Sequence, residues 1–339
     1  MRARTRRLLA SLPLLVHAAI ADRATAQGVE GDLSGLALEN AELFVQPLTQ
    51  GLGFAMTSGL FDEAKPLGRF GFDVGIRVNA ALPPTEAETF SAVLPASVVW
   101  NRPVLGPRTY SNPFKGKGAS LLSPTAVGDG PGVILEPTGQ FRSDLVLYGQ
   151  NPANYEIAFP EGLKIPAIPF LVAHASVGLG FGTDVTVRFI PEIEVDDELG
   201  AIKAMGFAVR HEISTWIPMP LDLSVVLGTQ TLNVGDYLEA SSTQYGLVAG
   251  RGLGPLSLFV SGIARSASVN ISYTVENPDD NPGLPEDGTE IRFEEDIESG
   301  VALGAGARLS LLFMNIDGQY VMDDYNGFSV KMGFGLGRR

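Results

Sequence analysis

The feature that most constrains this sequence is an alternation of large apolar residues with small or charged ones. Its last segment has Phe328, Val330, Met332, Phe334 and Leu336 at every second position, with Ser329, Lys331, Gly333, Gly335 and Gly337 between them. A period of two is typical of a β-strand with two unlike faces. Glycine is too small and lysine too highly charged to line a dry core, so the apolar face is predicted to look outward to lipid.

A second segment near the start of the chain has the same pattern. Phe70, Phe72, Val74, Ile76 and Val78 alternate with Gly71, Asp73, Gly75, Arg77 and Asn79. If these two segments are the first and last strands of one sheet, their pairing closes it and removes both edges. The sequence therefore predicts an all-β fold, a transmembrane antiparallel β-barrel of about 12 to 14 strands over residues 69–339.

Further segments after Pro169 repeat the alternation at lengths near the 9–11 residues that a tilted membrane strand needs. The connections between them alternate in length, as expected for periplasmic turns and external loops. The predicted turns are residues 180–182, 214–220, 252–255 and 310–311, and the predicted loops are residues 191–201, 231–244, 273–300 and 322–327.

The amino terminus has the three parts of a cleaved secretory signal. Arg2, Arg4, Arg6 and Arg7 precede an apolar run, and Ala24-Thr25-Ala26 provides a cleavage site before Gln27. Cutting off residues 1–26 removes five arginines and one aspartate, which leaves 19 of 24 basic and 37 of 38 acidic residues, a net charge of −18. This acidity argues against nucleic acid as a partner. With no cysteine, a disulfide framework and thiolate metal sites are excluded.

Residues 27–68 precede the first strand and have a mixed composition. Residues 33–48 indicate one short helix that Pro47 ends, and residues 51–56 indicate a glycine-rich turn. Such a segment can fold back into the lumen as a plug, as in wider barrels. A periplasmic extension is the alternative.

Residues 83–169 are rich in proline and have the least regular pattern. Strand-like pieces occur at residues 89–100 and 141–148. The span is interpreted either as a long external loop or as extra hairpins, and the pattern leaves both open.

Charged side chains occupy the polar positions of the predicted strands. The lumen-facing candidates are Asp73, Arg77, Arg188, Arg210, Glu212, Asp222, Arg265, Arg308, Asp317 and Lys331. One interpretation is a charged lumen that selects or binds a solute. The other is a set of paired side chains that fill a narrow interior. Arg210, Glu212 and Asp222 are on neighbouring strands, which favours an inward cluster.

No motif for catalysis is present, so we expect neither an enzyme nor a cofactor. The acidic residues 276–296 lack the spacing of a calcium loop and indicate a solvated loop instead of a metal site. Trp216 is in a predicted turn, where an aromatic ring suits the membrane interface.

Two stretches carry a resemblance to a known family. Residues 59–65 with Phe70-Gly71-Phe72-Asp73, and Arg210-His211-Glu212 with Trp216-Ile217-Pro218, resemble a family of uncharacterised exported proteins of Gram-negative bacteria. The resemblance implies an outer-membrane barrel but no activity. The layout, with about 40 residues ahead of the barrel, also resembles the long-chain fatty-acid transporters, in which this segment is a hatch inside a 14-stranded barrel.

Three functions follow as hypotheses. The first is an outer-membrane channel or transporter for small solutes, hydrophobic ones included, with lipid and the barrel assembly machinery as partners. The second is a surface-exposed structural or adhesion barrel without transport. The third is an exported soluble β-sandwich.

Overall fold

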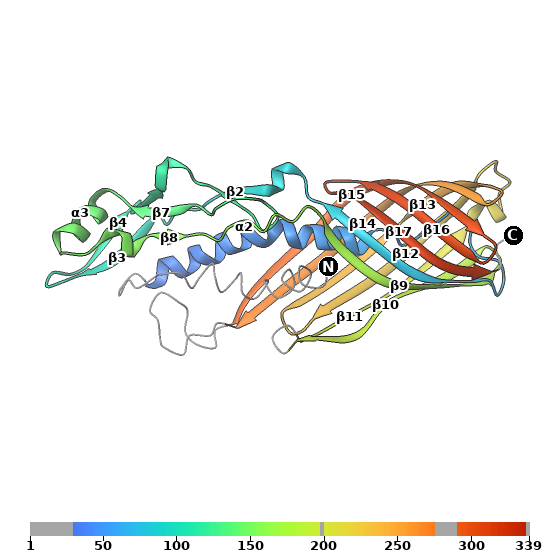
Figure 1. Ribbon diagram of the computed structural model, residues 1–339, viewed down its shortest axis with the longest axis horizontal. Coiled ribbons are helices and arrows are strands. Elements are labelled where there is room, and N and C mark those ends of the chain that lie inside the picture. Colours follow the sequence, from blue (N-terminus) through green and yellow to red (C-terminus); the bar gives the residue numbers. More distant parts are fainter. Residues whose placement is uncertain (1–29, 197–199, 275–289, 337–339) are drawn as a thin grey trace. The chain divides into compact units, whose positions relative to one another are not determined.

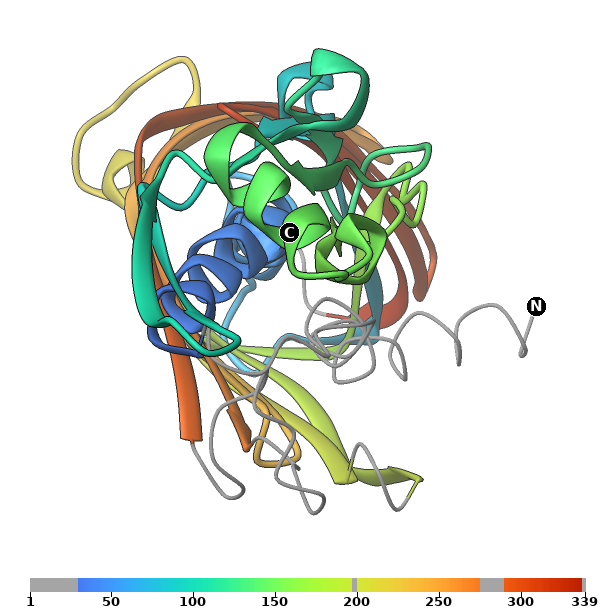
Figure 2. The same cartoon turned by 90° about the vertical axis from the view of Figure 1, so that its left-hand side faces the viewer.

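Ten strands of the computed structural model form one closed antiparallel barrel (Figures 1 and 2). The structure describes residues 30–196, 200–274 and 290–336, so the predicted signal and most of the acidic segment 276–296 lie outside the described residues. The barrel strands are β1 (Phe72–Leu82), β9 (Ile168–Gly180), β10 (Thr183–Asp196), β11 (Gly200–Glu212), β12 (Asp222–Val234), β13 (Leu238–Leu253), β14 (Leu256–Thr274), β15 (Glu290–Leu311), β16 (Met314–Met322) and β17 (Asn326–Leu336).

The first and last strands close the barrel. β1 pairs with β17 from Phe72 opposite Leu336 to Leu82 opposite Asn326, and its other edge pairs with β9. The predicted closed barrel is confirmed. It has ten strands and not 12 to 14, because residues 83–167 add no strand to it.

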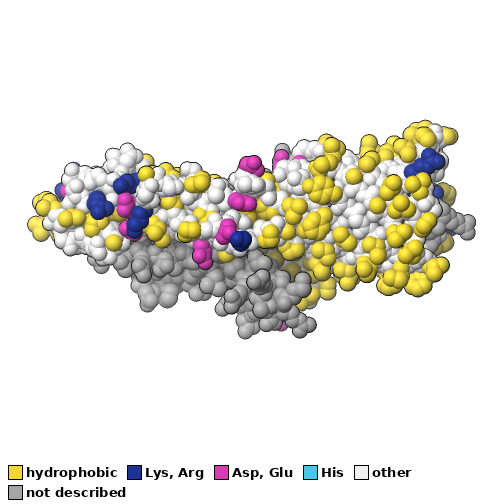
Figure 3. Space-filling view, turned by 45° about the horizontal axis from the view of Figure 1, so that its top comes forward, with side chains coloured by type: hydrophobic (Ala, Val, Ile, Leu, Met, Phe, Trp, Pro, Cys, Tyr) yellow, Lys and Arg dark blue, Asp and Glu magenta, His cyan; other side chains and the backbone are white. Residues whose placement is uncertain are grey.

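The outer face of the barrel is apolar. Phe328, Val330, Met332 and Phe334 are 42–58% exposed, whereas Ser329 and Lys331 are fully buried. On the side seen in Figure 3, hydrophobic side chains cover the strands, and lysine and arginine gather near one end of them. The sandwich hypothesis is wrong, because the ten strands form a single sheet and leave these apolar residues outside.

Three short turns are found where the sequence predicts them, whereas the predicted turn 310–311 lies inside β15 and the turn is at residues 312–313. The strands also extend into predicted loops. β12 and β13 are paired as far as Val234 opposite Leu238, inside the predicted loop 231–244. The pattern of apolar residues outside and polar residues inside is lost there, because Thr231 and Ser241 are on the exposed face and Leu232 and Ala240 are buried, while the backbone ladder continues. β10 and β11 likewise extend into the predicted loop 191–201.

The described residues within 1–48, 85–165 and 272–293 form a compact unit separate from the unit that contains the barrel. Between β1 and β9 this unit has short strands and one helix around an aromatic core of Trp100, Tyr110, Phe114 and Phe141. The elements are β2 (Thr89–Ser91), β3 (Ser97–Arg102), β4 (Gly106–Ser111), β5 (Phe114–Gly116), β6 (Leu122–Pro124), β7 (Ile134–Pro137), α3 (Gly139–Leu147) and β8 (Ile157–Ala158).

The strand expected at residues 141–148 is wrong, since this stretch is helix α3. Phe141 and Leu145 are both fully buried. A spacing of four places them on the same side of a helix, facing the aromatic core. The spacing of the apolar residues in this stretch fits a strand period of two as well as a helix period of about 3.6, and packing against the core favours the helix.

The helix expected at residues 33–48 is present as part of α2 (Glu30–Thr57). The helix runs through Pro47 and through the predicted glycine-rich turn, so the expected end at Pro47 and the turn are wrong. A Cβ on Gly53 would be 2.6 Å from Cδ1 of Ile297 and 3.2 Å from Cβ of Ala267. The glycines therefore let the helix approach the barrel wall closely and do not form a turn. None of the described helices is long and apolar enough to span a membrane.

The core between β1 and β9 contains a buried pair with a predictable pH response. The Tyr110 hydroxyl donates to Asp144 at 2.7 Å, and Arg108 donates to the same oxygen at 2.9 Å. The Tyr110 hydrogen bond is the main cause of the lowered pKa of Asp144. Burial, followed by that hydrogen bond, raises the pKa of Tyr110 to about 12.

We expect this unit to be most stable between about pH 4 and pH 10. A lowered carboxyl pKa gives stability that is present above the unfolded value and is lost as the pH falls through the folded value. A raised phenol pKa gives stability that is lost as the pH rises past 10. Trp100 fluorescence in a Trp216→Phe background, followed through unfolding at a series of pH values, measures the two limbs of this profile, the loss of stability at low pH and the loss at high pH. Tyr110→Phe should flatten them, and unchanged limbs would contradict the assignment.

Candidate functional site

The interior of the barrel is crossed by residues 49–68, here called the inner segment. It comprises the end of α2 and the following coil, and it belongs to the same compact unit as the strands. Its backbone is bonded to the wall along its length. Asn79 donates to the carbonyls of Ala55 (2.9 Å) and Ser58 (3.0 Å), Arg210 to that of Glu63 (2.5 Å) and Ser224 to that of Ala64 (2.6 Å), while the Leu67 N–H donates to Asp184 (2.9 Å).

Asp62 is the charged centre of the inner segment. Its carboxylate accepts from Lys331 of β17 at 2.6 Å, from Arg210 of β11 at 3.4 Å and from Arg308 of β15. The side chain is 6% exposed. Three strands are therefore tied by ion pairs to one residue that belongs to none of them.

The same cations reach further carboxylates on the wall. Asp73 accepts from Lys331 at 2.7 Å and from Arg308, Asp184 accepts from Arg210 at 2.5 Å, and Asp317 accepts from Arg77 at 2.7 Å. All eight side chains are 6% exposed or less. The charged cluster is Asp62, Asp73, Asp184, Asp317, Arg77, Arg210, Arg308 and Lys331, and its formal charges sum to zero.

Two other candidates are inside the barrel but outside this cluster. Arg188 is fully buried and donates to the carbonyl of Met56 at 3.3 Å. Arg265 pairs with Asp323 at 2.6 Å and lies over the ring of Phe54 at 4.2 Å.

Glu212 and Asp222 are only partly buried, at the end of the barrel that has the short turns. Glu212 accepts from Ser214 at 2.7 Å. Arg210 instead pairs with Asp184 and Asp62. The structure therefore does not bring the three residues Arg210, Glu212 and Asp222 together as one cluster.

Apolar packing also holds the inner segment. Leu60, Phe61 and Ala64 pack against inward residues of β11 to β14, and the buried cluster on that wall is Ala208, Val226, Val248 and Phe259. Glycines make room for them. A Cβ on Gly250 would be 3.1 Å from Cβ of Ala64, and one on Gly228 would meet Leu60 at even closer range.

Gly59→Ala is expected to loosen the inner segment. Gly59 has φ +64°, and a Cβ there would be 2.7 Å from Oδ1 of Asn79 and 2.8 Å from Nη1 of Arg77. The left-handed backbone costs about 1 kcal/mol, and moving the buried arginine adds to this. The loosening is measured as a fall in the temperature at which the protein loses its folded migration in detergent. Gly254→Ala is the control, because Gly254 has φ +68° with nothing within 4 Å. Equal effects would contradict the packing account.

Cavities lie on both sides of the inner segment. A cavity of about 640 Å³ near the short turns is lined by residues that include Lys65, Asp222 and Arg251. On the side of α2 there are smaller cavities of about 160 Å³ and 20 Å³. The inner segment, with its ion pairs and apolar contacts, thus separates two hollow regions of one barrel.

Two central residues were missing from the predicted set. Asp184 could have been predicted as lumen-facing, because it lies on the polar side of a predicted strand and alternates with Val185. Asp62 has no periodic signal, since it lies in a coil and its role depends on the fold of distant strands. In the described part of the chain, no group of three or more His, Asp or Glu residues could hold a metal ion.

Solved structures give distant matches. The in-vitro folded trimer form of the outer membrane protein OmpT of Vibrio cholerae is 8% identical over 78% of this chain and 99% of that one, with a TM-score of 0.25. OccAB1 of Acinetobacter baumannii is 8% identical over 81% and 99%, with a TM-score of 0.20. OprD of Pseudomonas aeruginosa is 10% identical over 81% and 96%, with a TM-score of 0.16. Scores this low carry nothing from those proteins to this chain.

No curated protein sequence matches this one. A family profile does match, and it extends over residues 5–336. The chain belongs to that family, which is described as a family of unknown function, DUF6588.

Proposed function

We propose that the protein is an outer-membrane channel for small hydrophilic solutes, and that the inner segment holds it closed. The apolar outer face supports a membrane location, because the hydrocarbon core of a bilayer shields such a face from water. A ten-stranded barrel is little wider than the eight-stranded kind that side chains fill completely. A segment of chain in its lumen is therefore enough to block it.

The contacts of Asp62 carry this proposal. A segment that fills the lumen permanently could be held by apolar packing alone. This segment is instead tied to three strands by ion pairs of one carboxylate, and ion pairs can separate and form again. Hollow regions on both sides of the segment support a path that the segment interrupts. The charged residues near the larger cavity favour hydrophilic over hydrophobic solutes, which separates this proposal from fatty-acid transport.

The test compares the full chain with a variant that lacks residues 27–68 but keeps residues 1–26 for export. Both are reconstituted into liposomes, and uptake of arabinose is measured. We expect little flux through the full chain and clear flux through the variant. Absence of flux in both, with heat-modifiable migration retained, would defeat the channel proposal.

The unit between β1 and β9 supports a second candidate, a surface scaffold or adhesion protein. An insertion with its own aromatic core is more than a loop needs in order to join two strands. This hypothesis predicts that protease on whole cells cleaves the chain within residues 273–300, and that neither form of the protein passes solute.

A further inference from the structure

We propose that solutes pass along the wall formed by β13 to β16, and that Phe259 is the gate of this path. The inference rests on the proposed channel and deepens it, since it assigns a route and a residue. The charged cluster would then hold the inner segment in place, and of its residues Arg308 lines the cavity of about 640 Å³ at the far end of the route.

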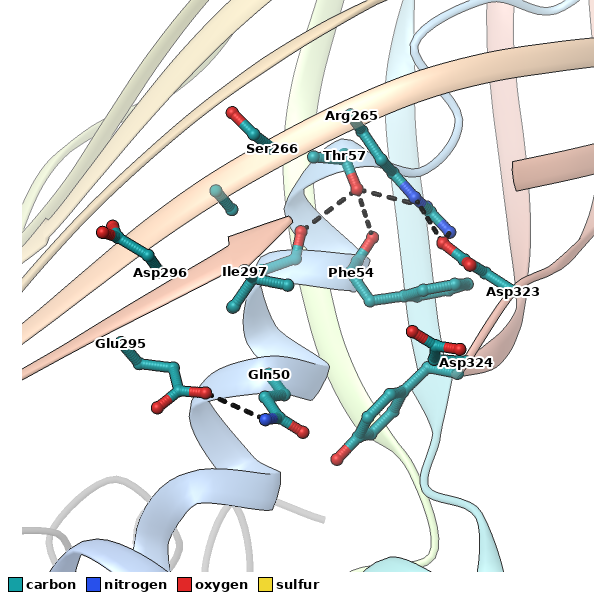
Figure 4. Close-up of a pocket in the computed structure, with 13 residues that line it drawn as sticks. Gln50, Phe54, Thr57, Arg265, Ser266, Glu295, Asp296, Ile297, Asp323 and Asp324 are labelled. Atoms are coloured by element: carbon teal, nitrogen blue, oxygen red, sulfur yellow. Dashed lines mark hydrogen bonds and ion pairs between the residues drawn. The ribbon is translucent and has the colours of Figure 1, made fainter. Parts of the chain in front are cut away.

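The route begins in the cavity of about 160 Å³ beside α2 (Figure 4). Phe54 and Thr57 of the helix face Arg265 of β14 and Asp323 of the β16–β17 turn in this view. The hydroxyl of Thr57 accepts from Arg265 at 3.2 Å. Thr57 and Arg265 also line the second cavity, of about 20 Å³, so the two cavities adjoin.

The second cavity has a polar lining with unused hydrogen-bonding capacity. Gln244 is 3% exposed and faces it together with Ser261 and Gln319. Gln319 donates to Ser261 at 3.4 Å, but its buried Oε1 has no hydrogen-bond partner among the described residues. A buried acceptor normally has a partner. Water or the hydroxyl of a passing solute would provide the missing donor.

Phe259 ends this cavity. It lines the 20 Å³ space, while the two residues before it, Ser257 and Leu258, line the 640 Å³ space beyond. Phe259 is 4% exposed and belongs to the apolar cluster with Phe61 and Ala64 of the inner segment. A Cβ on Gly306 would be 2.9 Å from Cε1 of the Phe259 ring, so the ring packs directly against β15.

The charged cluster offers no comparable route. Of the eight residues in the charged cluster, Arg308 lines one of these three cavities. The other seven are 6% exposed or less and bonded to one another. Opening a path through the cluster means separating several buried ion pairs, whereas opening the path at Phe259 means moving one aromatic ring.

The chain has no cysteine, so single cysteines can report the route. Ser261→Cys is placed in the wild-type and Phe259→Ala backgrounds, and the full-length proteins are reconstituted in planar bilayers in KCl. A small membrane-impermeant methanethiosulfonate is then added. We expect Phe259→Ala to raise the current several-fold, to speed labelling of the thiol at position 261 several-fold, and to let that labelling block the current.

Three controls make the outcomes decisive. Ser329→Cys replaces a fully buried side chain of β17 whose hydroxyl accepts from Arg77 of the charged cluster, and its thiol should label slowly in both backgrounds. Phe334→Ala removes the same side chain from the outer face and should not change the current. Phe61→Ala tests the same gate if Phe259→Ala fails to assemble.

Folded Phe259→Ala or Phe61→Ala protein with wild-type current and labelling would overturn the inference. Equally fast labelling of the thiols at positions 329 and 261 would overturn it too. If the variant without residues 27–68 still conducts, the channel proposal survives and only the route is wrong. If that variant is also silent, the channel proposal itself has failed.

Discussion

Asp62→Asn is expected to open the barrel and lower its stability. The change removes the carboxylate shared by Lys331, Arg308 and Arg210, and the formal charge of the buried cluster goes from zero to +1. Removing one partner of a buried ion pair costs about 3–5 kcal/mol, because the other charge is left without compensation. We expect a value near the lower end, since Asp73 still contacts Arg308 and Lys331.

Single-channel conductance and the temperature at which folded migration is lost measure the two effects. We expect frequent openings and a lower transition temperature. The double variant Asp62→Asn with Lys331→Gln returns the formal charge to zero and should recover part of both. Recovery would not occur if Asp62 acted only by filling space.

Asp129→Asn is the matched control for Asp62→Asn. Asp129 pairs with Lys164 at 2.5 Å, but the two side chains are 62% and 75% exposed. An exposed pair is screened by water and contributes little to stability. We expect unchanged conductance and stability. A conductance in Asp62→Asn equal to that of Asp129→Asn would contradict the closing role of the inner segment.

Val330→Arg is expected to prevent stable assembly of the barrel. Val330 is 46% exposed on the outer face of β17. An arginine on the lipid face of a barrel costs about 2–4 kcal/mol at the middle of the bilayer. On a face in contact with water the same change usually alters stability by about 0.5 kcal/mol or less. The size of the effect therefore tells which solvent the residue meets.

Refolding yield into lipid vesicles, followed by heat-modifiable migration, gives the measurement. Val99→Arg is the control, because Val99 has a similar exposure of 42% but lies on β3, outside the barrel. We expect normal assembly for Val99→Arg and a strongly reduced yield for Val330→Arg. Equal yields would mean that the outer face is not covered by lipid.

The architecture was predictable from the sequence where the two faces of a strand differ in chemistry. Phe328 to Leu336 shows both faces clearly, and the closing partner of this strand, β1, has the same signature. The strand count failed in residues 83–167, because proline-rich segments with several short strands resemble loops and hairpins alike. Helix α2 continues past Pro47 because packing of Gly51 and Gly53 against the wall outweighs local propensity.

The candidate site was predictable only in part. Arg77, Arg308 and Lys331 alternate with apolar residues, which predicts that they face inward, and all three are buried. Their pairing was not predictable, because it depends on strand register and on Asp62, which comes from a coil. That the lumen selects a solute stays a prediction.

The central claim is that alternate residues of each strand face lipid while their neighbours face a filled interior. Cysteines placed singly at positions 328 to 334 of the cysteine-free chain, labelled with a fluorophore and reconstituted with brominated lipid, test it most directly. We predict strong quenching at positions 328, 330, 332 and 334 and weak quenching at 329 and 333. Quenching without this alternation, or none at Phe328, Val330, Met332 and Phe334, would contradict the account.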